Sequence, residues 1–376
     1  MSDEFKRKLE AFENGQLKGE ELIEFEKELA KLEQYQEYLE EKSPKQKLQM
    51  NVEKQKKILR RSKWRARFQT AALALGIFIV VLIASIILTG VYYSWGNPDR
   101  SDVFTDVIDY TLTVTEPYGD VGSTSSNAKP FFGMEMSRDL NKKVGKEIIQ
   151  MGELKVNFLF SLMSYPERNY TGNISQNQPS FTYPGFGDLS MAEWDRLKKL
   201  PEGTVVSAYL SFNKLVETSD VFQQFADMNF DITWFTVDTG IEGRDDWYGD
   251  FIGFPASPIW HDDDMIRGSR EEQKDFLFGK VVSEMYSSPD YEAGDSVILH
   301  KQFLKTLQFL EKHEKKAEQL YGRADLDLDK RIKYLEKNGI KHYGIVVTGP
   351  TKEILKLKEE KLISSVEVDE VGFWNW

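Results

Sequence analysis

The sequence contains no cysteine among its 376 residues. Disulfide bonds, thiolate metal ligands and cysteine nucleophiles are therefore excluded, and a domain outside the cell would have to be held by its core alone. Histidine is also scarce, with four residues that are far apart in the sequence: His261, His300, His313 and His342. No G-x-S-x-G, H-E-x-x-H or G-x-x-x-x-G-K-[ST] stretch occurs, so the sequence lacks the signatures of serine hydrolases, zinc proteases and P-loop enzymes.

Basic residues are fewer than acidic residues over most of the chain. The formal net charge is −12, and residues 68–376 contain 32 Lys and Arg against 47 Asp and Glu. Nucleic-acid binding needs basic patches, so we expect no direct nucleic-acid partner for this part. An acidic surface of this size suits a large, water-exposed domain.

Two acidic runs contain the residue types of a cation site. Asp262–Asp264 follow His261 directly, but consecutive side chains point in different directions. Asp325, Asp327 and Asp329, followed by Glu336, mimic a calcium loop, yet Lys330 stands where the sharp turn of that loop needs glycine. We interpret both runs as loop or helix-start acids and expect neither a metal ion nor a cofactor.

The sequence does have one long apolar run, FQTAALALGIFIVVLIASIILTGVYYSW, over residues 68–95. No charged residue occurs between Arg67 and Asp99. As a helix, its central residues 71–93 would measure roughly 34 Å, enough to cross a hydrocarbon layer of about 30 Å. Aromatic residues near both ends suit the membrane interfaces. The run predicts a single transmembrane helix rather than a buried core helix.

The flanks of this run predict its orientation. Residues 54–67 carry eight Lys or Arg and no acid, whereas the other flank begins with Asn97-Pro98-Asp99. The positive-inside rule places the N-terminus in the cytoplasm and the C-terminal part outside the cell. A signal-peptide core is about 7–15 residues long and lies near the start of a chain, so we expect no cleaved signal peptide here.

We therefore expect an α+β protein in four regions. These are a small all-α cytoplasmic domain (1–67), the transmembrane helix (68–95), a membrane-proximal outer region (96–188) and an outer α+β domain (189–376).

The first 42 residues predict two amphipathic helices. The first helix starts at Asp3 and ends at Asn14-Gly15, and the second starts near Glu20 and ends at Ser43-Pro44. A third helix is expected to run from Lys45 into the membrane. Apolar residues recur on one face of the first two helices: Phe5, Leu9, Phe12, Leu22, Phe25, Leu29, Leu32 and Leu39, joined by Tyr35 and Tyr38. Two short helices bury such a stripe poorly by themselves, so it serves either a coiled-coil dimer or the binding of a partner.

Residues 12–39, FENGQLKGEELIEFEKELAKLEQYQEYL, resemble the N-terminal helices of anti-sigma factors for extracytoplasmic-function sigma factors. That family shows a G-x-L turn, an E-E helix start and the zinc motif H-L-x-x-C-x-x-C. Gly15-Gln16-Leu17 and Glu20-Glu21 match the first two features. Glu28 stands at the histidine position, and Leu32 and Tyr35 stand at the cysteine positions, so the sequence looks like a zinc-less variant.

Together with the topology, the chain resembles the membrane anti-sigma regulators of Gram-positive bacilli, of the anti-sigma-M type with sigma-factor-regulator N- and C-terminal regions. The resemblance implies a negative regulator that sequesters a sigma factor at the membrane until an envelope signal releases it. Its partners would be the sigma factor, the lipid bilayer, and a second membrane regulator or a wall ligand. The residues expected to bind the sigma factor are Phe5, Leu9, Phe12, Leu22, Phe25, Leu29 and Leu32.

Two other functions stay open from the sequence. A structural coiled-coil dimer would use the same stripe for self-association. A cell-surface hydrolase would need a pair of carboxylates without a sequence signature, and the acid-rich outer part can neither show nor exclude one. We expect a binding protein and not an enzyme.

Beyond the membrane, the sequence predicts a mixed fold. Residues 103–115 alternate like a half-buried strand, residues 142–150 suit a short helix, residues 154–163 suit a strand and residues 164–188 suit a long loop.

A strand–helix–strand unit is predicted twice. The first consists of residues 204–212, 218–228 and 231–237, and the second of residues 341–348, 350–358 and 362–371. We expect both units to share one sheet in a ferredoxin-like arrangement. A pair of helices, residues 296–321 and 327–338, is expected between them.

Overall fold

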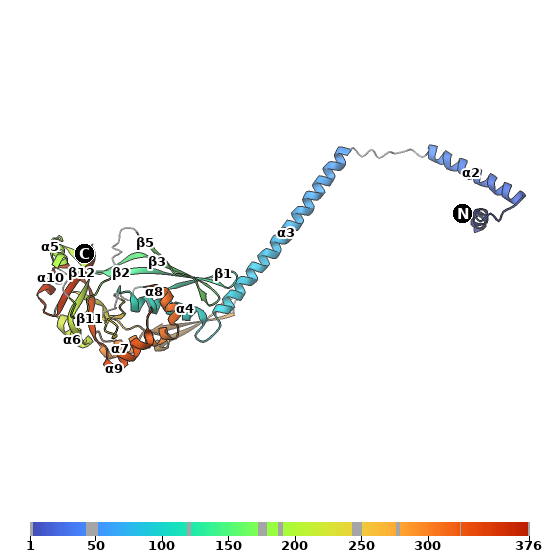
Figure 1. Ribbon diagram of the computed structural model, residues 1–376. Helices are drawn as coiled ribbons and strands as arrows, with labels where there is room; N and C mark the ends of the chain where they lie inside the picture. Colours follow the sequence, from blue (N-terminus) through green and yellow to red (C-terminus); the bar gives the residue numbers. More distant parts are fainter. Residues whose placement is uncertain are drawn as a thin grey trace. The chain divides into compact units, whose positions relative to one another are not determined.

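The computed structural model describes residues 3–42, 52–118, 122–171, 179–186, 191–242, 250–275, 279–323 and 325–374 (Figure 1). It divides into two compact units, Met1–Phe78 and Ile79–Trp376. The first unit contains the predicted helices α1 (Asp3–Glu13) and α2 (Glu20–Lys42). The predicted helix end at Ser43-Pro44 and helix start at Lys45 lie outside the described residues.

The apolar run belongs to one continuous helix, α3 (Val52–Tyr93). In the described part of the chain, it is the one helix long and apolar enough to cross a membrane. Almost none of its apolar stretch is buried, whereas the core helix of a soluble protein would be covered by other elements. This exposure agrees with membrane association.

Residues 103–115 form a helix, so the predicted strand is wrong. Helix α4 (Arg100–Thr115) begins after Asp99, whose side chain accepts a hydrogen bond from the backbone N–H of Asp102 (2.8 Å). Buried residues occur all around the second half of the helix, including the consecutive run from Tyr110 to Thr115. A helix that is covered on every side shows no period of 3.6 in its sequence. The alternation of apolar and threonine residues therefore imitated a strand.

The first sheet is antiparallel and contains five strands. They are β1 (Ser125–Lys129), β2 (Gly133–Val144), β3 (Glu147–Leu159), β4 (Leu162–Met163) and β5 (Glu167–Tyr170). The order is β1-β2-β3-β4, and β5 also pairs with β3. The predicted strand 154–163 is confirmed as far as Leu159 in β3, but the chain then turns at residues 160–161 and returns as β4. The predicted loop 164–188 contains β5.

The predicted helix over residues 142–150 is wrong, because these residues form the end of β2, a turn at residues 145–146 and the start of β3. Val144 pairs with Glu147 across the turn, and Gly145 adopts a φ of +64°. Residues of β2 alternate between buried and more exposed positions along the whole strand, which is the period of a strand.

The second sheet is also antiparallel and has the order β12-β6-β11-β7-β8. Its strands are β6 (Thr204–Val216), β7 (Asp231–Val237), β8 (Gly253–Pro255), β11 (His342–Pro350) and β12 (Ile363–Phe373). Helix α6 (Thr218–Phe225) joins β6 to β7, and α10 (Thr351–Lys356) with the 3-10 turn η2 (Leu357–Glu359) joins β11 to β12. The two strand–helix–strand units interleave, because β11 lies between β6 and β7. The predicted ferredoxin-like sheet is therefore confirmed.

The remaining elements cover this sheet or extend from it. The predicted helix 296–321 divides into α7 (Ser296–Glu311) and α8 (Glu314–Tyr321), and the predicted second helix of the pair is α9 (Leu328–Asn338). The others are α5 (Met191–Lys198), the 3-10 turn η1 (Asp262–Asp264) and a separate hairpin of β9 (Ile266–Asp275) and β10 (Gly279–Ser287).

Two hydrophobic cores account for most of the buried residues in the second unit. The larger lies between the second sheet and its helices and includes Leu210, Phe235 and Phe303. The smaller joins Tyr93 at the end of α3 to Phe104 on α4 and to the first sheet. The last turns of α3 are therefore part of the C-terminal fold.

Candidate functional site

The N-terminal helices form a hairpin around Phe25. Helix α1 ends at Asn14-Gly15 as predicted: the Gly15 N–H donates to the carbonyl of Phe12 (3.0 Å), and Gly15 adopts a φ of +66°. The Phe25 side chain is 2 % exposed, and its ring centroid lies 5.5 Å from those of Phe5 and Phe12. Three aromatic rings thus pack α1 against α2.

The seven residues that the sequence assigned to partner binding differ in how exposed they are. Phe25 is buried inside the hairpin, and Leu32 is 45 % exposed on the second half of α2. The other five are half-buried: Phe5, Leu9, Phe12, Leu22 and Leu29. The N-terminal half of the stripe therefore holds the hairpin together, while its C-terminal half faces outward.

An exposed apolar row occupies that second half of α2. It consists of Leu32, Tyr35, Tyr38 and Leu39, which are 45–63 % exposed. Their spacing of three and four residues puts them on one side of the helix. The sequence shows this spacing, but it does not show that the hairpin leaves these residues uncovered while it buries Phe25.

The cysteine positions of the zinc motif carry Leu32 and Tyr35, and the histidine position carries Glu28. Glu28, Leu32 and Tyr35 are all exposed on α2, where they replace the histidine and cysteines of the family pattern. Over the described ranges, no group of three or more His, Cys, Asp or Glu side chains is placed to hold a metal ion.

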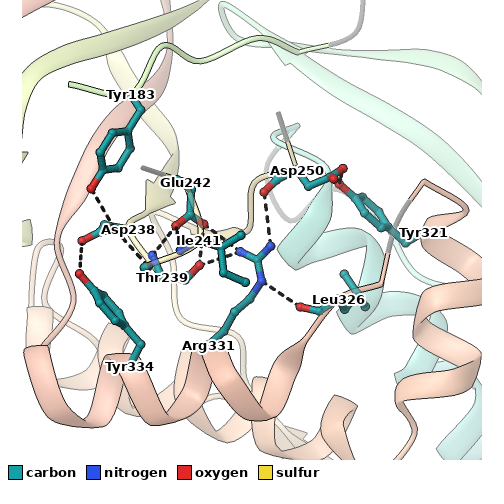
Figure 2. Close-up of polar contacts among 11 residues, drawn as sticks. Tyr183, Asp238, Thr239, Ile241, Glu242, Asp250, Tyr321, Leu326, Arg331 and Tyr334 are labelled. Carbon is teal, nitrogen blue, oxygen red and sulfur yellow. Dashed lines mark hydrogen bonds and ion pairs between the residues drawn. The ribbon is translucent and has the colours of Figure 1, made fainter. Parts of the chain in front are cut away.

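A buried polar centre lies in the C-terminal unit between the end of β7 and α9 (Figure 2). Arg331 and Glu242 form an ion pair of 2.8 Å, and both side chains are almost completely buried. The other Glu242 oxygen accepts hydrogen bonds from the backbone N–H groups of Thr239 (2.8 Å) and Ile241 (3.1 Å). The Arg331 guanidinium also donates to the Leu326 carbonyl (2.9 Å). The centre fixes the loop after β7 onto α9.

Two tyrosines extend this centre toward the surface. The hydroxyls of Tyr183 and Tyr334 donate to opposite oxygens of Asp238, at 3.2 Å and 2.8 Å (Figure 2). Burial, with the hydrogen bond to Asp238 second, raises the pKa of Tyr334 to about 12. Neither hydroxyl ionises near neutral pH, and the Glu242 carboxylate is saturated with donors. The arrangement therefore stabilises the fold.

Lysines pair with four of the carboxylates in the acidic runs singled out in the sequence. Lys305 Nζ lies 2.5 Å from Asp263 Oδ1 and 2.9 Å from Asp264 Oδ2. In the second run, Lys330 pairs with Asp327 (2.5 Å) and Lys333 pairs with Asp329 (2.6 Å). These carboxylates thus complete ion pairs within the chain.

The structure brings two of the four histidines together. His300 and His342 both place Nε2 within hydrogen-bond distance of the Thr218 hydroxyl, at 2.6 Å and 2.7 Å. His342 Nδ1 also lies 3.0 Å from the Thr236 carbonyl oxygen. Burial lowers the pKa of His342 to about 3, so the ring is neutral at physiological pH. This cluster lies in the core beside β7. Its hydrogen bonds satisfy buried polar atoms, which indicates a structural role.

A polar depression opens between the end of α4, β5 and the end of α8. Its lining includes Glu116, Arg168, Tyr165 and Arg323. Arg168 pairs with Glu116 and donates to the Leu320 carbonyl (3.1 Å). Glu116 and Arg168 thus pair with each other in the wall of the depression.

The comparisons with known proteins bear on the whole chain. Residues 56–149 match the family described as sigma factor regulator N-terminal, and residues 197–370 match sigma factor regulator C-terminal. The chain is 30 % identical over 385 aligned residues to the probable anti-sigma-M factor YhdL of Bacillus subtilis (strain 168), and the alignment covers 100 % of both chains. No solved structure matches. The resemblance of the chain to anti-sigma regulators of the anti-sigma-M type is thus confirmed, and the chain belongs to the sigma factor regulator family of anti-sigma factors, a family of regulatory proteins.

Proposed function

We propose that this chain is a membrane-anchored anti-sigma factor that holds an extracytoplasmic-function sigma factor at the cytoplasmic face of the membrane. An envelope signal received by the C-terminal unit releases the sigma factor. The observation that carries the proposal is the 30 % identity with a probable anti-sigma-M factor along the full length of both chains. The proposed regions are those expected from the sequence: 1–67 inside, 68–95 across the membrane, and 96–188 and 189–376 outside.

The exposed row on α2 is the proposed centre of the sigma-binding surface. An apolar helix face that its own fold leaves uncovered is suited to a hydrophobic groove on a partner. Of the seven residues expected from the sequence, Leu32 belongs to this row, and the half-buried side chains at its margin extend it. Phe25 acts indirectly, because it holds the two helices in place.

Charge supports the same partner. Residues 1–42 contain 13 acids against 7 bases, so the hairpin carries a net negative charge. Surfaces of a sigma factor that read DNA are basic, because they neutralise phosphates. A negatively charged hairpin would compete with DNA for such a surface. Its charge would also speed its association with the sigma factor.

Catalysis has no part in the proposed function. The carboxylates of Glu242 and Asp238 accept hydrogen bonds from several donors, and the family is regulatory. We propose that the C-terminal unit is a sensor that binds a second membrane regulator or a wall ligand.

The test is co-purification of the full-length chain from membranes with each extracytoplasmic-function sigma factor of its host. The variant Leu32→Ser/Tyr35→Ser removes two exposed anchors, each worth on the order of 1–2 kcal/mol. Together these two losses should weaken sigma-factor binding roughly thirtyfold to a thousandfold, and transcription from the dependent promoter should rise. Val297→Ser/Phe373→Ser is the control, because these side chains are apolar and at least as exposed but lie in the C-terminal unit.

Two results would contradict the proposal. Wild-type chain that captures none of the sigma factors would end the anti-sigma function. A double variant that loses self-association in sedimentation, with no sigma factor bound by either protein, would establish the coiled-coil dimer instead.

A further inference from the structure

Two hairpin tips of the first sheet pack against the C-terminal end of α3. Residues 130–132 connect β1 to β2, and residues 160–161 connect β3 to β4. The rings of Phe132 and Phe160 stack with their centroids 4.6 Å apart. The ring of Tyr92 on α3 lies 5.8 Å from Phe132 and 5.5 Å from Phe160, edge-on to both.

Polar side chains of α3 satisfy the backbone of these tips. The Ser85 and Thr89 hydroxyls accept hydrogen bonds from the backbone N–H groups of Phe131 and Phe132, the latter at 2.9 Å. The Tyr93 hydroxyl lies 3.1 Å from the Phe132 carbonyl and 2.9 Å from the Phe160 carbonyl. In turn, the Phe160 N–H donates to the Phe132 carbonyl (2.9 Å). Irregular backbone is tolerated at membrane depth only where its polar groups are satisfied in this way.

The same turns of α3 show apolar side chains on their other faces. Ile86, Ile87, Leu88 and Val91 are 46–61 % exposed, whereas Ser85 and Thr89 are buried under the hairpin tips. Ser85 lies roughly 12 Å below Tyr93 along the helix axis, at about 1.5 Å per residue. If α3 crosses the bilayer, lipid covers those apolar faces, and the tips lie at the same depth.

The tips and the strand residues directly beside them carry exposed apolar side chains. Phe131 is 54 % exposed and Leu162 is 73 % exposed, and Leu159 and Phe160 are exposed as well. Phe131, Phe132 and Phe160 adopt φ values of +61°, +60° and +55°, a left-handed conformation that usually falls to glycine or asparagine. A bulky ring is costly at such a position, so its presence indicates a use for the ring.

We propose that these two hairpin tips insert into the bilayer leaflet that holds the C-terminal end of α3. Phe131, Phe160 and Leu162 then contact acyl chains, and the C-terminal unit is fixed on the lipid surface by three points rather than by a single helix. The inference rests on the membrane span of the proposed function and is independent of sigma-factor binding.

The absence of cysteine makes the test direct, because each single-cysteine variant carries one fluorescent label. The full-length chain is reconstituted into phosphatidylcholine–phosphatidylglycerol vesicles with an environment-sensitive dye at Phe131→Cys or Leu162→Cys. Leu88→Cys reports the same depth on the lipid-facing side of α3, Leu75→Cys reports the middle of the apolar run, and Val297→Cys reports an exposed site on α7. Brominated acyl chains and aqueous iodide serve as the two quenchers.

We expect dyes at Phe131→Cys and Leu162→Cys to emit at shorter wavelength than the dye at Val297→Cys. Brominated lipid should quench them to about the same extent as the dye at Leu88→Cys, and iodide should quench only Val297→Cys. Quenching of Phe131→Cys and Leu162→Cys by iodide, with Leu75→Cys quenched by lipid, would overturn the insertion and leave the membrane span intact. Failure of lipid to quench Leu75→Cys would overturn the span, and the insertion with it.

Discussion

At the scale of single residues, the fold shifts the pKa of Asp106 on α4. Burial, followed by the nearby carboxylates of Asp262, Asp109 and Asp102, raises the pKa of Asp106 to about 7. An ordinary aspartate, as in the unfolded chain, has a pKa near 3.9. Between about pH 4 and pH 7, the Asp106 carboxyl is therefore protonated in the folded state and ionised in the unfolded chain.

The sign of the effect on stability follows from this difference. As the pH falls from about 7 to about 4, Asp106 becomes protonated in the folded state first, so its unfavourable contribution to folding disappears. We predict that Asp106→Asn raises the free energy of unfolding above pH 7 by on the order of 1–2 kcal/mol, less than the full pKa difference implies because the carboxyl is partly exposed. Thermal unfolding in detergent at pH 5 and pH 8 measures this gain.

Asp195 provides the control for that measurement, because it lies exposed on α5. Asp195→Asn should have the same stability difference between pH 5 and pH 8 as the wild type. If Asp106→Asn also keeps the wild-type difference, Asp106 does not control this part of the pH dependence.

At the scale of elements, the N-terminal hairpin depends on one buried ring. Phe25 is the residue of α1 and α2 that the structure buries, and it contacts the rings of Phe5 and Phe12. Removing a buried aromatic ring typically costs about 3–5 kcal/mol, which is more than two short helices can lose. We predict that Phe25→Ala abolishes hydrogen-exchange protection over residues 3–42 of the full chain.

The comparison with Leu32→Ala separates folding from binding. Leu32 is exposed, so its truncation should leave the protection of α1 and α2 unchanged while it weakens sigma-factor binding. Equal loss of protection in both variants would show that the hairpin needs the whole stripe for its own packing.

The elements that could be predicted from the sequence are those with a clear signal in their own residues. The stripe of α2, the uncharged run in α3 and the two strand–helix–strand units all carry a clear period or a clear end signal. Helix α4 and the turn at Gly145 were misread, the former because it is buried on nearly every side. The Asp99 cap was the available signal for α4, since Asp often precedes a helix.

The candidate site could be predicted only in part, for a related reason. The sequence places Phe25 and Leu32 on the same stripe, but the burial of one and the exposure of the other depend on how α1 folds back. Likewise, the contact of Phe131 and Phe132 with Ser85 and Thr89 joins residues more than 40 positions apart in the sequence. No local period records such a contact.

At the scale of the whole molecule, a buried ion pair joins the two sheets of the C-terminal unit. Lys142 on β2 and Asp369 on β12 lie 2.7 Å apart, and both side chains are almost fully buried. Asp369→Ala would leave the Lys142 charge buried without its partner, at a cost of about 3–5 kcal/mol. We predict a correspondingly lower free energy of unfolding in detergent for this variant.

The double variant Lys142→Met/Asp369→Leu tests whether the charge itself causes that loss. Two apolar side chains of similar size leave no buried charge, so most of the stability should return. If the double variant is as unstable as Asp369→Ala, the loss comes from packing between the sheets rather than from the isolated lysine.

The orientation of the whole molecule depends on the charges beside α3. Residues 54–67 contain eight bases and no acid, and such a flank is retained in the cytoplasm. We predict that a reporter active only in the cytoplasm works when fused before Met1 and fails when fused after Trp376. A reporter active only outside the cytoplasm should give the opposite pattern.

Replacing the bases of residues 54–67 by glutamine gives the sharper test, because it removes the cause and leaves the apolar run unchanged. Without the basic flank, a fraction of the chains should insert with reversed or mixed orientation, and the sigma factor should be released in proportion. The hairpin of α1 and α2 can bind a sigma factor only on the side where the sigma factor resides. A chain that keeps its orientation without these bases would place the orienting signal elsewhere, and a wild-type N-terminus outside the cell would be incompatible with anti-sigma function.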